Sequence, residues 1–173
     1  MKLNGRQVIM ADIDTVWTAL LDPDVLKASV PGCTEISGSA EDGYEATVVQ
    51  KVGPVKATFK GSVVLSDMIK LKSLTLTGEG KGGAAGFAKG SADVRLELVD
   101  ETTVLHYDVE AKVGGKLAQL GSRIIDGFAK KMADQFFETF REVVEGPAED
   151  TDDTSSDAAP KKKGWLRKLV SNE

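Results

Sequence analysis

Four stretches of the chain alternate between apolar and polar residues with a period of two, which is typical of antiparallel strands that have one buried face. These stretches are residues 44–48, 55–65, 92–98 and 105–113. Residues 1–10 are expected to add an edge strand, and residues 71–76 a strand with a bulge at Ser73. The turns expected around these strands are Gly53-Pro54, Ser66-Asp67 and Asp100-Glu101. The pattern predicts a sheet of six or seven strands in meander order.

Two short helices are expected after the first strand. Asp14 is expected to cap the first of them, with Val16, Trp17 and Leu20 on one face. Asp22-Pro23 then ends this helix and starts the second. The second helix turns Leu26 and Val30 inward and ends at Pro31-Gly32.

A third, long helix is expected to follow Gly114-Gly115 and to reach about Glu145, a length of about 31 residues or roughly 46 Å. Its apolar stripe starts with Leu117, Leu120, Gly121, Ile124, Phe128 and Met132, and then rotates towards Phe136, Phe140, Val143 and Val144. One such helix over a curled antiparallel sheet predicts an α+β fold, which can enclose a cavity. Gly121 on the inward face, beside Ala118, fits either tight helix–sheet contact or space for a ligand.

The composition is that of a globular protein, with 173 residues, 41% hydrophobic residues and 28% charged residues. A net charge of −5 argues against nucleic-acid binding. One cysteine and one histidine exclude a disulfide framework, a cysteine-only metal site and a zinc site built on a histidine pair. The first residues do not form a signal peptide, and no apolar run reaches the roughly 18 residues of a spanning helix, so a cytoplasmic location is expected.

The composition changes at Gly146-Pro147, which predicts a globular domain over residues 1–147. Residues 148–160 carry five acids and no aliphatic side chain larger than alanine, so they are expected to form a disordered linker. Residues 161–173 predict a basic amphipathic tail that binds an anionic membrane surface reversibly. The residues expected to make this contact are Lys161, Lys162, Lys163, Trp165, Leu166, Arg167, Lys168, Leu169 and Val170. A solvated tail, or a tail that binds an acidic protein, remains open.

The other candidate motifs favour binding over catalysis. Residues 78–90 are rich in glycine, but a strand follows them, so a hairpin is expected in place of a nucleotide loop, and Phe87 could gate a pocket there. His106 falls on the polar side of its strand, away from a cavity, and Cys33 is expected to be a small buried residue. Because the inward positions carry almost no carboxylate or lysine, and only Tyr44 and Tyr107 as polar tips, neither catalytic residues nor a metal site is predicted.

Several of these segments together resemble the family named for the G subunit of carbon monoxide dehydrogenase. They are Val16-Trp17-x-x-Leu20-x-Asp22-Pro23, Val30-Pro31-Gly32-Cys33, Val52-Gly53-Pro54-Val55-Lys56, Gly78-x-Gly80, Gly115-x-Leu117-Ala118-x-Leu120-Gly121-Ser122-Arg123 and Phe136-Phe137. The resemblance covers roughly residues 1–146. It implies a START-like, helix-grip fold that binds hydrophobic ligands. Members often carry a longer apolar C-terminal anchor than the short basic tail of this chain.

The resemblance also implies an accessory protein of a molybdenum hydroxylase, such as carbon monoxide dehydrogenase, that tethers the enzyme to the cytoplasmic membrane and holds a quinone or lipid with no covalent cofactor. The residues expected to line the ligand are Leu26, Val30, Val48, Phe59, Val63, Leu76, Phe87, Leu96, Tyr107, Leu117, Leu120, Gly121, Ile124 and Phe128. Two alternatives stay open. One is an enzyme of the same fold, a cyclase or isomerase, and the other is an adaptor with a filled core.

Overall fold

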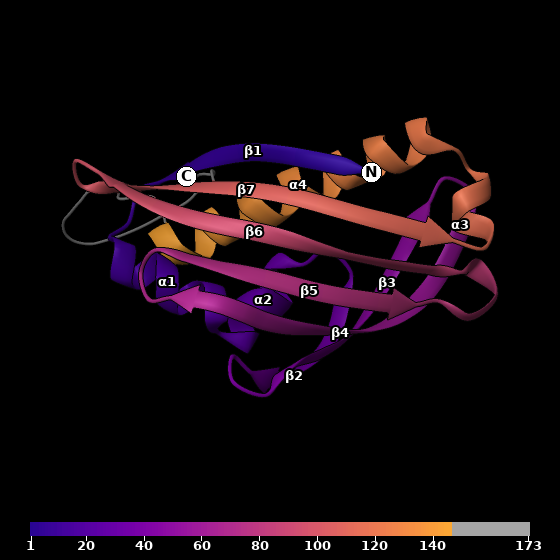
Figure 1. Ribbon diagram of the computed structural model, residues 1–173, viewed down its shortest axis with the longest axis horizontal. Coiled ribbons are helices and arrows are strands. Elements are labelled where there is room, and N and C mark those ends of the chain that lie inside the picture. The colour runs from indigo at the N-terminus through magenta and orange to yellow at the C-terminus, as the bar shows by residue number, and fades with distance from the viewer. Residues whose placement is uncertain (147–173) are drawn as a thin grey trace, which may run out of the picture.

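A seven-stranded antiparallel sheet dominates residues 1–146, the part of the chain that the computed structural model describes (Figure 1). Its strands are β1 (Lys2–Ile9), β2 (Cys33–Ser39), β3 (Gly43–Val52), β4 (Val55–Ile69), β5 (Ser73–Lys81), β6 (Phe87–Val99) and β7 (Thr102–Gly114). Strands β2 to β7 form a meander, and β1 pairs with β7 at the far edge. The predicted α+β fold and the meander are confirmed. Strand β2 was not predicted, because its sequence CTEISGS does not alternate apolar with polar residues.

The two short helices lie where the sequence placed them, as α1 (Ile13–Leu21) and α2 (Pro23–Ser29). The cap predicted for α1 is wrong, because Asp12 accepts the hydrogen bond from the Thr15 amide at 2.7 Å, while Asp14 lies in the first turn. Hydrogen bonds from the hydroxyl and the amide of Thr15 lower the pKa of Asp12. The predicted start of the second helix at Asp22-Pro23 is confirmed, and the Asp22 carboxylate caps it by accepting from the Asp24 amide at 2.8 Å.

The single long helix expected after Gly115 is wrong. The structure has a short helix α3 (Lys116–Gln119), then a break at Leu120 and Gly121, and then the helix α4 (Ser122–Glu145). A 3₁₀ turn from the β5–β6 connection, η1 (Gly83–Ala85), lies beside α3. The break arises because Gly121 has a φ of +88°, a left-handed conformation that an α-helix does not contain. Gly121 therefore does not lie on the inward face of a helix, and the space predicted from it there does not exist.

Strand β4 is longer than predicted, and the expected turn at Ser66-Asp67 is wrong. Asp67 has a φ of +50°, and the pairing of β4 with β5 shifts register between Ser66 and Ile69. The irregularity thus lies within β4, and Ser73, where a bulge was predicted, is a paired residue opposite Ile69. The turns at Gly53-Pro54 and Asp100-Glu101 are confirmed.

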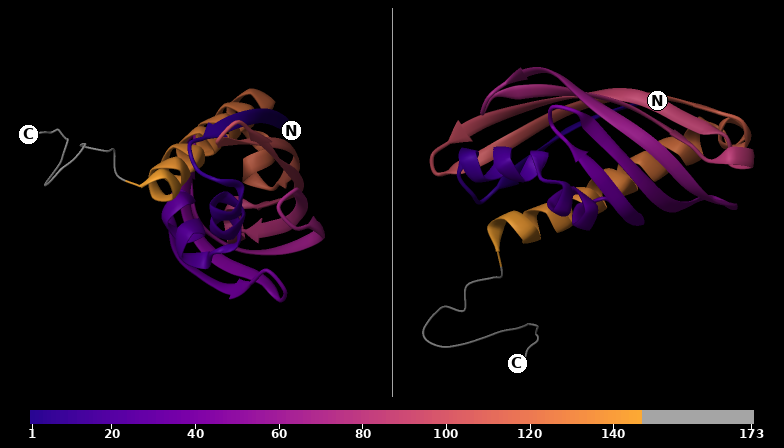
Figure 2. Two further views of the ribbon diagram at one scale, coloured as in Figure 1. Left: turned by 90° about the vertical axis from the view of Figure 1, so that its left-hand side faces the viewer. Right: turned by 90° about the horizontal axis from the view of Figure 1, so that it is seen from below.

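The sheet curls around α4, which crosses its concave face, and α1 and α2 lie beside the helix (Figure 2). Two apolar clusters connect the helices to the sheet. The larger lies where α1 meets the C-terminal half of α4, and its buried residues are Ile9, Val16, Trp17, Ala19, Leu74, Val94, Leu96, Leu105, Phe137 and Phe140. The smaller lies near α3 and is built on Val52, Leu117 and Ile125. The helix is thus held near both of its ends.

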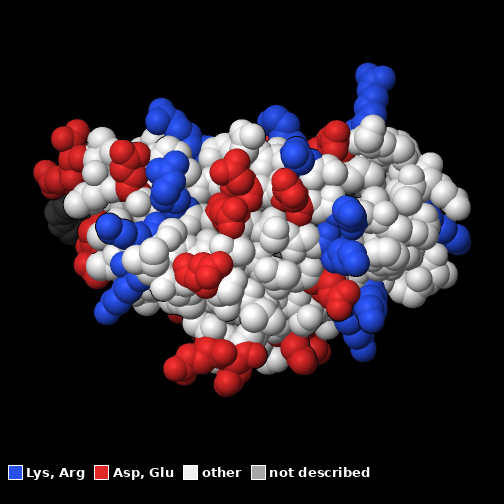
Figure 3. Space-filling model, in the orientation of Figure 1, with Lys and Arg blue, Asp and Glu red and all other residues white. Residues whose placement is uncertain are grey.

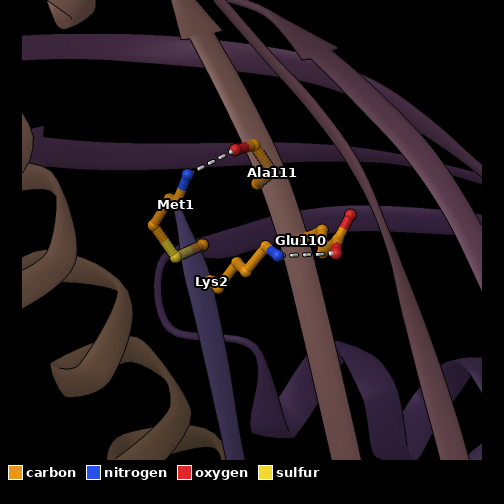
Figure 4. Close-up of polar contacts among 4 residues, drawn as sticks. All are labelled: Met1, Lys2, Glu110 and Ala111. Carbon is orange, nitrogen blue, oxygen red and sulfur yellow. Dashed lines mark hydrogen bonds and ion pairs between the residues drawn. The ribbon is translucent and has the colours of Figure 1, made fainter.

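Polar contacts fix the edge strand β1 to β7. The Met1 amino group donates to the Ala111 carbonyl at 3.0 Å, and the Lys2 ammonium lies 3.6 Å from the Glu110 carboxylate (Figure 4). At the other end of β1, Arg141 of α4 donates a hydrogen bond to the Gln7 side chain.

Neither α4 nor a shorter helix within residues 1–146 has the length and apolar composition that a membrane crossing requires. The predicted linker and basic tail lie outside the described residues.

Two glycines of this region should respond oppositely to substitution by alanine. Gly121→Ala places a Cβ on a residue with positive φ and should lower the free energy of unfolding by about 1 kcal/mol. Gly127→Ala lies inside α4 with no atom near the new methyl group, and should raise the free energy of unfolding by about 1 kcal/mol. Urea denaturation of both variants measures these changes. A stabilising Gly121→Ala substitution would contradict the break in the helix.

Candidate ligand-binding cavity

The concave face of the sheet has small residues at positions that pair across neighbouring strands. Ala46 lies opposite Gly61, Gly61 opposite Gly80, and Gly80 opposite Ala88, so a row across four strands carries nothing larger than a methyl group. A second row pairs Gly78 with Gly90 and Gly90 with Ala111. Because inward side chains fill the space between a sheet and the helix above it, these rows leave that space empty.

A cavity of about 560 Å³ occupies this space. Its lining comes from β1 to β7, from α1 and α2, and from Ala133, Phe136 and Phe137 on α4. A second cavity of about 400 Å³ lies closer to α3, beneath the first half of α4. The two share lining residues, which include Leu3, Val48, Phe59, Ala88 and Ala133. Together they form a continuous apolar space of the size that holds small organic ligands.

The glycines of this face do not all serve the same purpose. A Cβ at Gly90 would lie 2.2 Å from the carbonyl oxygen of Glu110, so the close approach of β7 requires glycine there. A Cβ at Gly80 would lie 3.9 Å from its nearest neighbour, the Cβ of Phe59. Backbone packing therefore does not require glycine at position 80, and its effect is to leave room inside the cavity.

Nine of the fourteen residues predicted to line a ligand lie on these cavities. The larger cavity is lined by Leu26, Val30, Val48, Phe59, Val63, Leu76 and Tyr107. The smaller one is lined by Leu117 and Phe128, and also by Val48 and Phe59. The alternation along the strands placed these residues, because a curled sheet turns every second side chain towards the helix.

The other five predicted residues lie elsewhere. Leu96 is buried in the cluster around α1. Phe87 lies on the outer face of the sheet, where its ring covers Gly114, so it does not gate the cavity. The break between α3 and α4 leaves Gly121 exposed and Ile124 42% exposed, while Leu120 packs beside the smaller cluster. Leu120, Gly121 and Ile124 were misplaced because the predicted continuous helix is broken, so these residues do not face the sheet as a single helix would have placed them.

Several lining residues were missed by the sequence argument. They include Leu3, Leu20, Ile36, Gly78, Gly80, Ala88 and Ala133. The glycine-rich run was interpreted as a hairpin loop, and the hairpin is confirmed, but Gly78 and Gly80 belong to β5 and Gly90 to β6. A signal was present, because the period-two pattern continues through Gly78-Glu79-Gly80-Lys81 with small residues in place of large apolar ones.

The polar groups near the cavity are largely occupied. The Tyr44 hydroxyl donates to the Leu21 carbonyl at 2.6 Å, and burial of the ring, with the charge of Asp22, raises the pKa of Tyr44. The Cys33 thiol donates to the Glu35 carbonyl at 3.3 Å. Tyr107, which also lines the larger cavity, stacks on Phe137 with 5.1 Å between ring centroids, and its hydroxyl lies against Gly5 of β1.

The candidate catalytic and metal chemistry does not come together. His106 lies 3.0 Å from Glu97 on the outer face, as the alternation predicted, and its strand β7 is separated from the Cys33 strand β2 by four strands. Within residues 1–146, no group of three histidine, cysteine or carboxylate side chains could hold a metal ion. This cavity is therefore suited to binding an apolar molecule.

A family model describes most of the domain. The model for the G subunit of carbon monoxide dehydrogenase (CoxG) matches residues 5–145. The chain belongs to the CoxG family. A search of curated proteins gave no match.

Solved structures confirm the START-like fold of this CoxG protein. A conserved protein from Geobacillus kaustophilus is similar to it with a TM-score of 0.78 and 29% identity, over 84% of this chain and 95% of that one. A START superfamily protein from Mycobacterium smegmatis has a TM-score of 0.64 and 12% identity, over 83% and 97% of the two chains. The Aha1 dimer from Colwellia psychrerythraea has a TM-score of 0.55 and 18% identity, over 84% and 96%. The last two likenesses show the fold alone.

Removing the Tyr44 hydroxyl tests whether its hydrogen bond to the Leu21 carbonyl stabilises the fold. Tyr44→Phe leaves the buried Leu21 carbonyl without its donor and should lower the free energy of unfolding by about 1 kcal/mol at neutral pH. The pKa of Tyr44 is raised in the folded state, so the protonated hydroxyl stabilises the fold fully below about pH 10, the pKa of the unfolded chain. This stabilisation is lost as the pH rises through the pKa of the folded state. Urea titrations at pH 8 and pH 11 should therefore show a smaller difference between the two proteins at the higher pH. A difference that grows with pH would contradict this assignment.

Proposed function

We propose that this CoxG protein is an accessory factor of a molybdenum hydroxylase of the carbon monoxide dehydrogenase type, and that it holds a quinone or a similar lipophilic molecule in its cavity. The proposal is supported by family membership and by one structural observation, the apolar space between α4 and the glycine- and alanine-rich face of the sheet. In this proposal the protein acts at the cytoplasmic face of the membrane, whose apolar interior dissolves such ligands.

The chemistry of the lining supports a lipophilic ligand with a small polar head. Burial of an apolar chain contributes about 0.8 kcal/mol for each CH₂ group, so a long isoprenoid or acyl tail binds without specific polar contacts. The Tyr107 hydroxyl is suited to donate a hydrogen bond to a carbonyl oxygen of the head group. The Phe136 and Phe137 rings beside it provide flat apolar surfaces for a ring system.

A carrier of this kind suits the needs of a partner that releases electrons. A quinone that receives two electrons from the partner and two protons from water becomes a quinol, which can return to the membrane. The protein itself then needs only to bind and release the acceptor. This role requires no catalytic residue in the cavity.

The enzyme alternative depends on titratable side chains that face the cavity. The described lining includes Glu79 and Lys89, but both are exposed and alternate with inward-facing residues of β5 and β6. The inward titratable groups are then Tyr44, Tyr107 and Cys33, and two of these three already donate hydrogen bonds to the backbone. The geometry thus favours binding over proton-transfer chemistry.

Filling the cavity should abolish uptake of the ligand. Ala92 faces the cavity from β6, and its neighbour Ser91 faces outward. We expect Ala92→Phe to weaken ubiquinone or menaquinone binding at least tenfold, because the new ring occupies the space of the ligand. Ser91→Phe adds the same ring to the outer face and should bind normally. Fluorescence titration of the full chain measures both affinities, and native mass spectrometry identifies the molecule retained on gentle purification.

Comparison of the two phenylalanine variants with the unmodified protein distinguishes a ligand carrier from a protein adaptor. If both phenylalanine variants bind a quinone as the unmodified protein does, the cavity is not the ligand site. If the unmodified protein takes up neither quinone nor lipid, the carrier role fails, and a role in protein assembly alone would account for the family membership.

Membrane recruitment through the tail needs a separate test. Replacing Lys161, Lys162 and Lys163 with glutamine in the full chain removes up to about 3 kcal/mol of attraction to an anionic surface. We expect this variant to co-sediment less with vesicles that contain phosphatidylglycerol. The loss should be strongest at low salt, because salt screens this attraction. Equal co-sedimentation at low salt would argue against a membrane role for the tail.

A further inference from the structure

Charged residues are segregated between the two ends of the domain. Eight basic residues lie around the end formed by α3, the β3–β4 turn and the β5–β6 hairpin, and we call this region the basic end. They are Lys51, Lys56, Lys60, Lys81, Lys89, Lys112, Lys116 and Arg123. The acidic residues among them are Glu45, Glu79 and Asp126. Residues 1–146 hold 17 basic and 21 acidic residues, so the basic end has a net charge of +5 and the remainder −9.

The space-filling view shows the same division over the outer face of the sheet. Basic side chains outnumber acidic ones on the half near α3, and acidic side chains gather over the other half (Figure 3). The lysines of the basic end are also paired with each other. Lys51 lies opposite Lys56, Lys60 opposite Lys81, and Lys89 opposite Lys112 in neighbouring strands.

Such pairs oppose folding, because like charges directly across a sheet repel each other. Within the described residues, no carboxylate lies within ion-pair distance of these six lysines. Lys2, which is near them, is already paired with Glu110 (Figure 4). Glu79 lies opposite Lys89 on β5 and offsets the repulsion between Lys89 and Lys112. The other two pairs have no carboxylate opposite them, and with the net charge of +5 they indicate a surface arranged for an external anion-rich partner.

Apolar side chains are exposed at the same end. Phe87 is 40% exposed on the outer face, in register with Lys81, and Ile124 is 42% exposed at the start of α4. Ile124 and Leu120 lie against the β3–β4 turn, since a Cβ at Gly53 would be 3.6 Å from the Ile124 side chain. Basic side chains around exposed apolar side chains form the arrangement that binds the interface of an anionic bilayer.

We propose that the basic end docks on an anionic lipid bilayer, with its lysines on the lipid phosphates and with Phe87 and Ile124 in the interface. The proposal rests on the membrane role given under Proposed function, but it assigns that role to the folded domain as well as to the tail. It also gives the smaller cavity a position next to the bilayer, since Leu117, Ile125 and Phe128 line that cavity at this end.

The acidic stretch of the same chain is poorly placed to cover the basic end. Helix α4 has 24 residues and is about 36 Å long, and the chain leaves it at the opposite end. Four of the five acids in this stretch, from Glu149 to Asp153, follow Gly146 by three to seven residues, which reach at most about 25 Å when fully extended, and only Asp157, 11 residues on, can reach about 40 Å. Lys161 follows by 15 residues and can reach about 50 Å, so the tail and the basic end can contact the same surface.

Vesicle binding of full-chain variants tests the proposal. The probe is phosphatidylcholine vesicles with and without phosphatidylglycerol. We expect Lys60→Gln/Lys81→Gln/Lys89→Gln to lower partition onto the anionic vesicles at least about tenfold. The matched control, Lys70→Gln/Lys72→Gln/Arg95→Gln, changes the net charge equally away from the basic end and should bind normally. The first variant should melt no lower than the unmodified protein, because the lost repulsion of Lys60 with Lys81 and of Lys89 with Lys112 offsets the lost attraction of Lys89 to Glu79.

A second pair of variants tests the apolar contact. Ile124→Ser and Val143→Ser remove equally exposed side chains, 42% and 44% exposed, from opposite ends of α4. We expect the first substitution to weaken vesicle binding several-fold and the second to leave it unchanged. Equal binding of both serine variants would overturn the apolar part of the proposal.

Repeating the lysine variants with the tail lysines replaced by glutamine separates this proposal from the tail. Loss of binding from the basic-end variant in both backgrounds supports docking by the domain. Loss from the tail variant alone overturns the proposal and leaves membrane recruitment by the tail intact. Binding that depends on neither set overturns both. Unchanged vesicle binding, with loss of binding to an acidic protein, would assign the basic end to a protein partner and also overturn the proposal.

Discussion

The structure depends on rows of small side chains that face a helix and do not fill the space beneath it. Ala46, Gly61, Gly80 and Ala88 pair across four strands, and the larger cavity lies between them and α4. The helix stays at this distance because it is held by apolar clusters towards its two ends, one with α1 and one with α3. A continuous core would pull the helix onto the sheet. The separation of the core into two clusters therefore preserves the space that the small side chains leave between them.

This arrangement was partly predictable from the sequence. The period-two alternation along residues 55–65 and 105–113 identified the strands and the inward side chains, because burial on one face is a local requirement of each strand. The cavity itself was expected for a wrong reason, a glycine inside a helix, when Gly121 in fact breaks that helix. Its real cause is the alignment of glycines and alanines from different strands, which depends on register. Strand register and helix breaks are tertiary properties, and no single segment encodes them.

The two clusters differ in strength, and this difference affects how a ligand could enter. The cluster around α1 contains ten buried residues and four aromatic rings in mutual contact, among them Phe136 and Phe140 with centroids 5.7 Å apart. The cluster near α3 contains three buried residues, and two glycines with positive φ, Gly115 and Gly121, flank α3. Local opening costs least where few apolar contacts must be broken, so the fold is weaker at α3 than at α1.

The weaker end is also the basic end, and this coincidence connects stability to function. Lysines placed opposite each other at positions 51 and 56, and at 60 and 81, reduce stability in the part of the sheet beside the smaller cavity. A bilayer that neutralised those charges would remove the repulsion and so stabilise the sheet at this end. The proposed docking also places the lining of the smaller cavity, which includes Leu117, Ile125 and Phe128, next to the bilayer. The end of the fold with the fewest apolar contacts to break would then be the one nearest to the store of lipophilic ligands.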